Sequence, residues 1–356
     1  MIFILIVILV TLVFTYTNGF HDTANSIATV VSTKVLTPRQ AILLATVFNL
    51  VGALAGTAVA STVGKDLVDA HFVTMNTILC GLIGAIGWNL LTWYYGIPSS
   101  SSQALIGGLI GAAVASARGN WDVVYWSKGS GPWWHKGGVI YKVVIPMITS
   151  PLCGLVIGFF VMACLYVILR NWRPITVGRV FGKLQLLSSS YMGFAHGTND
   201  AQKTMGIITL ALFTATAAGQ LDHLPGWLHF LHTPKFAVAL WVQILCGVTM
   251  AAGTAAGGWR IIRTLGHKMV KLQPVHGFAA ETTGATILAV TAQLGMPVST
   301  THAVTTSIMG VGAAKRLSAL KLTVVERIIW AWVLTLPATG GIGYVLVRLA
   351  QMLAWA

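Results

Sequence analysis

Charged residues are scarce in this sequence. Asp, Glu, Lys and Arg make up 8% of its 356 residues, hydrophobic residues make up 56%, and the mean hydropathy is +0.79. A soluble domain typically carries about 25% charged residues, so this composition excludes a water-soluble globule. A membrane-spanning helix needs about 20 apolar residues, so the chain has room for roughly eight to ten such segments. We therefore predict an all-α polytopic membrane protein in a lipid bilayer.

Cysteine is also rare, and it offers no metal framework. The 4 cysteines each lie inside an apolar run, without the spacing of a zinc site. An HExxH motif is missing as well. These absences argue against a membrane-embedded hydrolase built on the histidines and aspartates of the motifs below. We expect no resident cofactor and no enzymatic activity.

Acidic residues are the scarcer of the two charged groups. The chain has 8 Asp and Glu but 22 Lys and Arg, which gives a net charge of +14. The basic residues lack the aromatic interleaving of a nucleic-acid surface, so no nucleic-acid partner is expected. They gather instead in short loops, which the positive-inside rule places in the cytoplasm. These loops are residues 34–39, 170–183, 260–271 and 315–327.

What the chain does contain is two motif pairs in the same order. GFHDTAN at residues 19–25 resembles GTNDAQK at 197–203, and GIPSSSSQA at 96–104 resembles GMPVSTTHA at 295–303. Residues 64–73 and 217–234 are nearly free of Lys and Arg, so matching loops face opposite sides, as in an inverted-topology repeat. We predict a first repeat at 1–169, a cytoplasmic linker at 170–183 and a second repeat at 184–356.

Residues 74–117 and 276–314 are predicted to be two re-entrant hairpins, with tips near 97–103 and 296–302. With six crossings, both termini then lie outside. The loop at 118–140 carries Lys and Arg although it is placed outside, so full crossings remain an alternative for the first hairpin. The first apolar segment has no basic residue before Lys34 and no cleavage site, so it is expected to be retained as a helix.

Broken helices survive in hydrocarbon only where protein or water supplies hydrogen-bond partners. We predict four breaks, at residues 18–22, 98, 197–200 and 297, which together indicate a cavity near the bilayer midplane. A helix beginning at each Pro-Ser/Thr cluster directs free N–H groups at that cavity, which suits an oxyanion. Eight or more uncharged donors there indicate a site for phosphate or sulfate.

Asp22 and Asp200 occupy matching places in the two halves. A carboxylate in the membrane core costs about 3 kcal/mol or more and usually marks an ion path. Beside an anion site, a cation held by these carboxylates would offset the repulsion and couple the two fluxes, as in a symporter. Lys203 lies three residues after Asp200 on the same helix face, and it could hold the anion or neutralise Asp200.

Three further residues are candidates for cation coupling. Glu281 lies within a predicted membrane segment, where it could couple a cation or face water at an interface. His21 and Asn199 lie directly before the two aspartates, and a histidine titrates near neutral pH.

The motifs and the block GFAAETTGATILAVTAQLGMPVSTTHAV at residues 277–304 resemble the inorganic phosphate transporter (PiT) family over nearly the whole chain, and its bacterial low-affinity branch in particular. The resemblance implies proton-coupled uptake of phosphate, often as a neutral metal-phosphate complex, by a homodimer in the bacterial inner (plasma) membrane. It implies a phosphate site at Asp22, Asn25, Ser100, Ser101, Ser102, Gln103, Asp200, Ser299, Thr300 and Thr301, to which we add Lys203 and His302.

Sodium-coupled phosphate transport and sulfate transport remain open as alternatives. Sodium-coupled members typically have Asn where this chain has His21, which favours protons over sodium here, and a divalent metal is a candidate co-substrate. One lineage resembles sulfate permeases. Hydrogen phosphate, HPO₄²⁻, carries a proton that a carboxylate can accept, whereas sulfate carries none. The two aspartates therefore favour phosphate as the substrate. A passive anion channel would leave both aspartates unexplained.

Overall fold

The all-α fold predicted from the sequence is confirmed. This computed structural model describes residues 2–130, 132, 136–257, 262, 272–315 and 322–353, and among these residues it contains helices and no β-strand. Most of the predicted basic loop at 260–271 lies outside the described residues. The helices are α1 (Ile2–Ser32), α2 (Pro38–Ala53), α3 (Ala58–Lys65), α4 (Met75–Tyr95), α5 (Ser101–Ser116), α6 (Ile145–Leu169), α7 (Pro174–Ala217), α8 (Leu240–Ala256), α10 (Pro274–Gln293), α11 (Thr300–Lys315) and α12 (Leu322–Met352).

Several helices are suited to a membrane. Among the described residues, four segments are long and apolar enough to cross one. The bent pair α2 and α3, which meet at 68°, would be a fifth. The four segments are Ile2–Ser32, Met75–Tyr95, Ile140–Leu169 and Val325–Met352.

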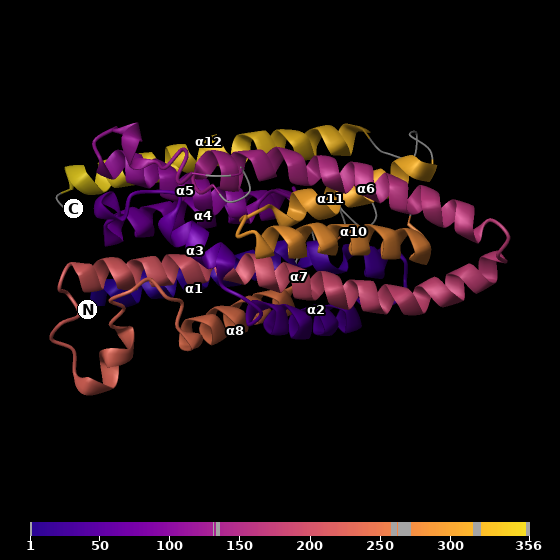
Figure 1. Cartoon of the computed structure of the whole chain (residues 1–356), viewed down its shortest axis with the longest axis horizontal. Helices are drawn as coiled ribbons and strands as arrows, with labels where there is room; N and C mark the ends of the chain where they lie inside the picture. The colour runs from indigo at the N-terminus through magenta and orange to yellow at the C-terminus, as the bar shows by residue number, and fades with distance from the viewer. Residues whose placement is uncertain are drawn as a thin grey trace.

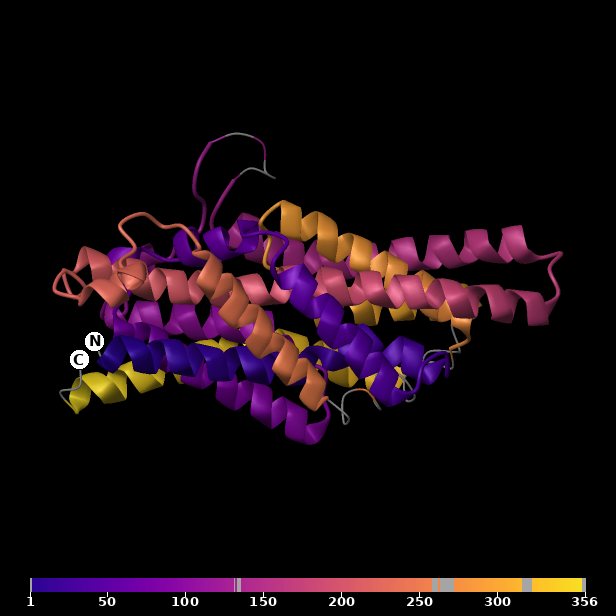
Figure 2. The same cartoon turned by 90° about the horizontal axis from the view of Figure 1, so that it is seen from below.

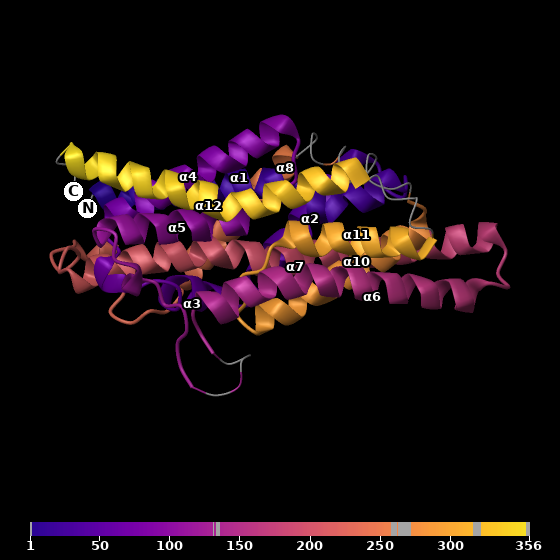
Figure 3. The same cartoon turned by 90° about the horizontal axis from the view of Figure 1, so that it is seen from above.

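The helices form an elongated bundle (Figure 1). Both termini lie at one end, and the connection between α6 and α7 lies at the other (Figures 1, 2 and 3). Helices α1 and α6 therefore run away from the termini, whereas α7 and α12 run back towards them (Figure 1). The assignment of these ends to the two faces of a membrane stays a prediction.

Two helical hairpins enter the bundle from opposite ends. Hairpin 1 consists of α4 and α5, and hairpin 2 consists of α10 and α11; Figure 3 shows one in each half of the bundle. Their tips meet, because Ser102 Oγ in hairpin 1 donates to the Val298 carbonyl oxygen in hairpin 2 over 3.2 Å. The helix α4 alone is long enough to span a membrane, but the chain turns back after it.

The two hairpin tips have the same local cause. Gly96 and Gly295 both have φ of 64°, a left-handed conformation that ends the first helix and that glycine adopts without strain. A proline follows two residues later, and then a serine caps the second helix. Ser100 Oγ accepts from the Gln103 N–H over 3.2 Å, and Ser299 Oγ accepts from the His302 N–H over the same distance.

Two of the four predicted helix breaks are wrong. The tips at Pro98 and Pro297 do interrupt the helices, but α1 and α7 continue through residues 18–22 and 197–200. The glycines there serve close packing instead. A Cβ on Gly19 would lie 2.4 Å from the Met250 carbonyl oxygen, and a Cβ on Gly197 would lie 2.2 Å from that of Asn49. An additional break, between α2 and α3, was not anticipated.

Each hairpin packs on a long helix from the other half of the chain. Helix α5 lies against α12, and α11 lies against α6. Glycines allow both contacts, since a Cβ on Gly111 would lie 2.0 Å from the Gly340 carbonyl oxygen, and one on Gly310 would lie 2.2 Å from that of Leu155.

The first prediction concerns this contact. Gly111→Ala should lower the melting temperature of the purified protein in detergent, because the added methyl group would displace the backbone of α12 at a cost of about 1–3 kcal/mol. Gly87→Ala is the matched control, since a Cβ on Gly87 meets no atom within 4 Å among the described residues. Equal melting temperatures for the two variants would contradict the close approach of α5 and α12.

Candidate functional site

Two buried carboxylates lie close to each other inside the bundle. Asp22 is in α1 and Asp200 is in α7, and their exposed fractions are 1% and 0%. A buried charge must be paired or hydrogen-bonded to be tolerated, so the groups around each aspartate define the site.

Asp22 is held by its neighbour and by both hairpin tips. His21 Nδ1 lies 2.8 Å from Asp22 Oδ1. From hairpin 1, the Ser101 hydroxyl donates to Asp22 Oδ2. From hairpin 2, Thr301 Oγ1 donates to Asp22 Oδ1 over 3.4 Å. The aspartate therefore links α1 to both tips.

Asp200 has one partner that Asp22 lacks. The Lys203 ammonium, one turn further along α7, forms an ion pair with Asp200 Oδ1. His196 Nε2 lies 3.2 Å from Asp200 Oδ2, and Thr300 Oγ1 donates to the same oxygen over 3.1 Å. Each aspartate thus faces a histidine and a threonine, but only Asp200 faces a fixed positive charge.

Asn25 connects the two aspartates through hairpin 2. Its Nδ2 donates to Thr300 Oγ1 over 3.2 Å and to Thr301 Oγ1 over 2.9 Å. These threonines donate in turn to Asp200 and Asp22. The structure therefore brings together eight of the predicted substrate-site residues, which we call the aspartate cluster: Asp22, Asn25, Ser101, Ser102, Asp200, Lys203, Thr300 and Thr301.

The other predicted substrate residues have different surroundings. Ser100 and Ser299 cap α5 and α11 with their hydroxyl groups. His302 stacks on Trp332 of α12, with ring centroids 3.9 Å apart. Among the described residues, neither ring nitrogen of His302 and neither side-chain polar atom of Gln103 has a hydrogen-bond partner, although both residues are buried.

Such buried polar atoms are rare in folded proteins and need an explanation. Within the part of the chain that the structure describes, Asn25 Oδ1 and both side-chain polar atoms of Asn199 also lack a partner. These four residues belong to the two motif pairs, but in the described part of the chain buried polar atoms without a partner also occur outside the motifs, for example in Thr46, Asn89 and Ser150. The unused hydrogen-bonding capacity of the motif residues can accept a polar ligand but does not by itself mark a site.

Glu281 lies outside the aspartate cluster. It is in α10, 1% exposed, and no contact with Asp22 or Asp200 is among its bonds. Thr29 Oγ1 donates to Glu281 Oε1 over 2.6 Å, Gln185 Nε2 donates to the same oxygen over 3.0 Å, and the Ser188 hydroxyl donates to Oε2. Glu281 therefore joins α10 to α1 and α7 rather than facing water at an interface.

Three side chains of the site could hold a metal ion. One ligand atom each from Asp22, His196 and Asp200 lies within 4.8 Å of the others, and all three residues are buried. Carboxylate oxygens and an imidazole nitrogen suit several divalent ions.

Two residues that the site uses were not among the predicted substrate or coupling residues. His196 approaches Asp200, and Asn18 Oδ1 lies 2.7 Å from Ser101 Oγ. A signal was present in the paired motifs, because residues 18–22 read NGFHD and residues 196–200 read HGTND. The histidine and the asparagine exchange places between the two halves, and each aspartate retains one of each nearby.

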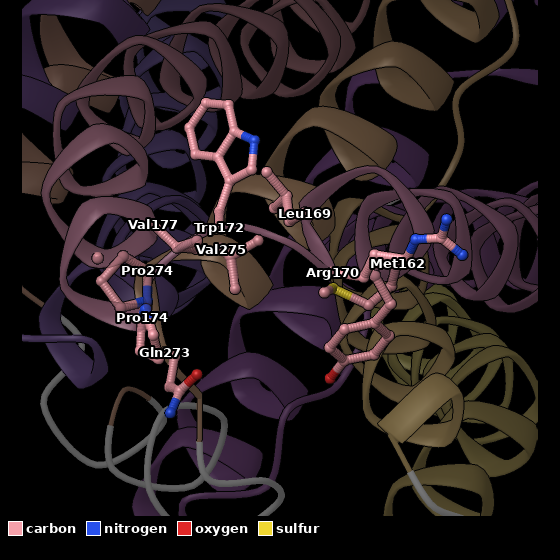
Figure 4. A pocket seen from close by; sticks show the side chains of 11 residues that line it. Met162, Leu169, Arg170, Trp172, Pro174, Val177, Gln273, Pro274 and Val275 are labelled. Atoms are coloured by element: carbon pink, nitrogen blue, oxygen red, sulfur yellow. The ribbon is translucent and has the colours of Figure 1, made fainter.

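A separate pocket lies near the connection between α6 and α7. Its volume is 410 Å³, and Figure 4 shows mostly apolar side chains from α6, α7 and the start of α10 around it. None of its lining residues belongs to the aspartate cluster. Arg170 is the one ionised side chain that lines it, so it lacks the paired charges of the aspartate cluster.

The chain matches the profile of the phosphate transporter family over residues 18–343. It is 40% identical over 351 residues to a "Probable low-affinity inorganic phosphate transporter" of Bacillus subtilis (strain 168), covering 98% of this chain and 97% of the relative. It is 43% identical over 337 residues to a protein of the same description from Rhizobium meliloti (strain 1021), covering 93% and 91%. Among solved structures it resembles "The sodium-dependent phosphate transporter", with a TM-score of 0.80, 22% identity, and coverage of 99% and 100%.

The second prediction tests the surroundings of Glu281. Glu281→Ala should lower the melting temperature more than Glu281→Gln, because it leaves three donors without an acceptor at about 1–3 kcal/mol for each buried group. Glu326→Ala, at an exposed position in α12, is the control and should change little. If Glu281→Ala melted like the control, the three hydrogen bonds would be refuted.

Proposed function

The chain belongs to the phosphate transporter family, and we propose that it imports inorganic phosphate across the bacterial inner membrane by symport with protons. The observation that carries this proposal is the aspartate cluster, in which Asp22 accepts hydrogen bonds from hydroxyls of both hairpin tips and Asp200 accepts one from the tip of hairpin 2. A binding site shared by two hairpins that enter from opposite ends suits alternating access.

The hairpin tips supply the phosphate-binding groups of this proposal. Helices α5 and α11 begin at Ser101 and Thr300, so their first N–H groups and hydroxyls can surround a tetrahedral oxyanion without placing a charge beside it. The hydroxyls of Ser101, Thr300 and Thr301 now donate to the aspartates. When phosphate binds, the same hydroxyls turn from carboxylate oxygen to phosphate oxygen.

Cations are required because phosphate and two carboxylates repel one another in a medium of low dielectric constant. We propose that protons are taken up at Asp22 and Asp200, with His21 and Asn199 beside them and Glu281 as a further carboxylate. His21 and His196 each lie within 3.2 Å of an aspartate oxygen, so a proton on either ring would offset one carboxylate charge. Neutralisation of this kind makes phosphate binding and cation binding mutually dependent.

A divalent metal ion is a candidate co-substrate. Asp22, His196 and Asp200 offer ligand atoms close enough to share one ion, and a neutral metal-phosphate complex would enter the cluster at less electrostatic cost than the free anion. In this proposal the metal travels with phosphate and is released with it.

The proposed domain organisation, oligomeric state and membrane topology are those predicted from the sequence. We propose an inverted repeat of residues 1–169 and 184–356, a homodimer, both termini outside and a cytoplasmic linker at 170–183. Most of that linker is helical, since α7 begins at Pro174. The transported phosphate is not chemically altered.

Sodium coupling is the second candidate. It is favoured by the fold of the sodium-dependent phosphate transporter, which this chain resembles over 99% of its length. Sulfate has the same tetrahedral shape as phosphate and is the competing substrate.

The third prediction is the direct test of the proposed function. Purified protein in proteoliposomes should take up radiolabelled phosphate when an inward proton gradient is imposed, and excess sulfate should not compete. Protein-free liposomes are the control. If uptake needs a sodium gradient, sodium and not the proton is the coupling cation. If excess sulfate displaces phosphate, sulfate is the substrate of the site.

The fourth prediction concerns the coupling carboxylate. Asp22→Asn should abolish the stimulation of phosphate uptake by a proton gradient, because the amide cannot take up a proton. Asp222→Asn, which alters an exposed residue between α7 and α8, should behave like the wild type. Wild-type rates and an unchanged pH dependence in Asp22→Asn would rule out Asp22 as a coupling group.

A further inference from the structure

Lys203 is the only cationic side chain among the eight members of the aspartate cluster, and it is 1% exposed. An ammonium group has three donors, and the structure gives each one an oxygen acceptor. The acceptors are Asp200 Oδ1, Ser102 Oγ and, at 3.0 Å, the Val298 carbonyl oxygen. In this arrangement protein oxygens therefore occupy all three donors of Lys203.

The three acceptors are the oxygen types that bind an alkali cation in transporters. A carboxylate, a hydroxyl and a carbonyl from unwound backbone serve this purpose where helices are interrupted near the midplane. Val298 lies in the tip of hairpin 2 before α11 begins, and Ser102 lies in the first turn of α5. The ammonium thus sits where α7 and both hairpins contribute one oxygen each.

The matching position in the other half is occupied by a neutral residue. Asn25 follows Asp22 by three residues, just as Lys203 follows Asp200. Its Nδ2 donates to the two threonines of hairpin 2 and does not neutralise Asp22. The cluster therefore carries a built-in positive charge on one side only.

We propose that the Lys203 ammonium is a tethered cation, which permanently fills the place of a mobile alkali cation beside Asp200 and leaves the Asp22 side to exchange the coupling cation. This inference rests on the proposed function of cation-coupled phosphate transport. It makes Lys203 a residue that determines coupling-ion specificity, because a cation attached to the chain cannot be carried across the membrane with phosphate.

Replacement of the lysine by the residue of the other half is the decisive change. Lys203→Asn removes the ammonium and leaves the Asp200 carboxylate with the Ser102 and Val298 oxygens around it. These oxygens should then bind Na⁺, and the variant should require Na⁺ where the wild type does not.

Two measurements on Lys203→Asn form the fifth prediction. Phosphate uptake into proteoliposomes by Lys203→Asn should fall about tenfold or more in choline chloride and should recover in sodium chloride, whereas wild-type uptake should be equal in both salts. Without phosphate, sodium chloride should raise the melting temperature of the variant by roughly 2–4 °C relative to choline chloride and leave that of the wild type unchanged.

Two controls separate a cation site from a general effect of charge. Lys128→Asn removes a half-exposed lysine that pairs with Asp66 at 3.3 Å, outside the cluster, and it should gain no response to Na⁺. Asp200→Asn/Lys203→Asn removes the carboxylate together with the ammonium, so its melting temperature should also be insensitive to Na⁺. If Lys203→Asn alone does not yield folded protein, Lys203→Gln is measured in its place.

Failure of the inference differs from failure of the proposed function. If neither uptake nor melting temperature responds to Na⁺ in either Lys203 variant, the tethered cation is refuted. It is also refuted if the variants bind phosphate more weakly and Na⁺ does not restore the affinity, because Lys203 would then be a ligand of the anion. Absence of phosphate uptake by the wild type in either salt would refute the transport function itself. The melting experiment without phosphate still decides the inference in that case.

Discussion

The need to compensate buried charge governs the centre of this molecule. Two carboxylates and one ammonium lie in α1 and α7 with at most 1% exposure, so protein groups must supply their hydrogen bonds. The hairpin tips meet this need with hydroxyl groups and a backbone carbonyl. Glycines in α5 and α11 in turn allow each hairpin to reach the centre, because they let it approach a long helix of the other half. The close helix packing at these glycines thus brings the hairpin tips to the ionised groups.

The same constraint limits what the hydroxyl groups of the cluster can bind. Thr300 and Thr301 each receive a hydrogen bond from Asn25 and donate to an aspartate. A hydroxyl has one proton to give, so in the proposed function donation to phosphate must come at the expense of donation to a carboxylate. A proton or another cation on that carboxylate lowers the cost of the exchange. In the proposed function, anion binding and cation binding are therefore linked by a shared set of donors rather than through a distant conformational signal.

The sequence predicted the hairpin tips because their determinants are local. A left-handed glycine, a proline and a capping serine specify a turn and a new helix within a few residues, and the repeated pattern occurs at both tips. The sequence did not predict that α1 and α7 continue through their polar motifs, since glycine and asparagine suggest a break when their neighbours are unknown. Those glycines face α8 and α2, which are distant in the chain. The contacts of Glu281 with Thr29, Gln185 and Ser188 likewise join three helices far apart in sequence, and no local pattern indicates them.

The exchange of partners between the halves also bears on how the protein is made. Hairpin 1 is synthesised early, but α12, against which α5 packs, is the last helix of the chain. Likewise α1 and α2 pack on α8 and α7, which are made after the first half is complete. The N-terminal half therefore lacks the helices on which its hairpin and first helices pack until the second half has been synthesised. Although the sequence repeats, the unit that folds is the whole chain.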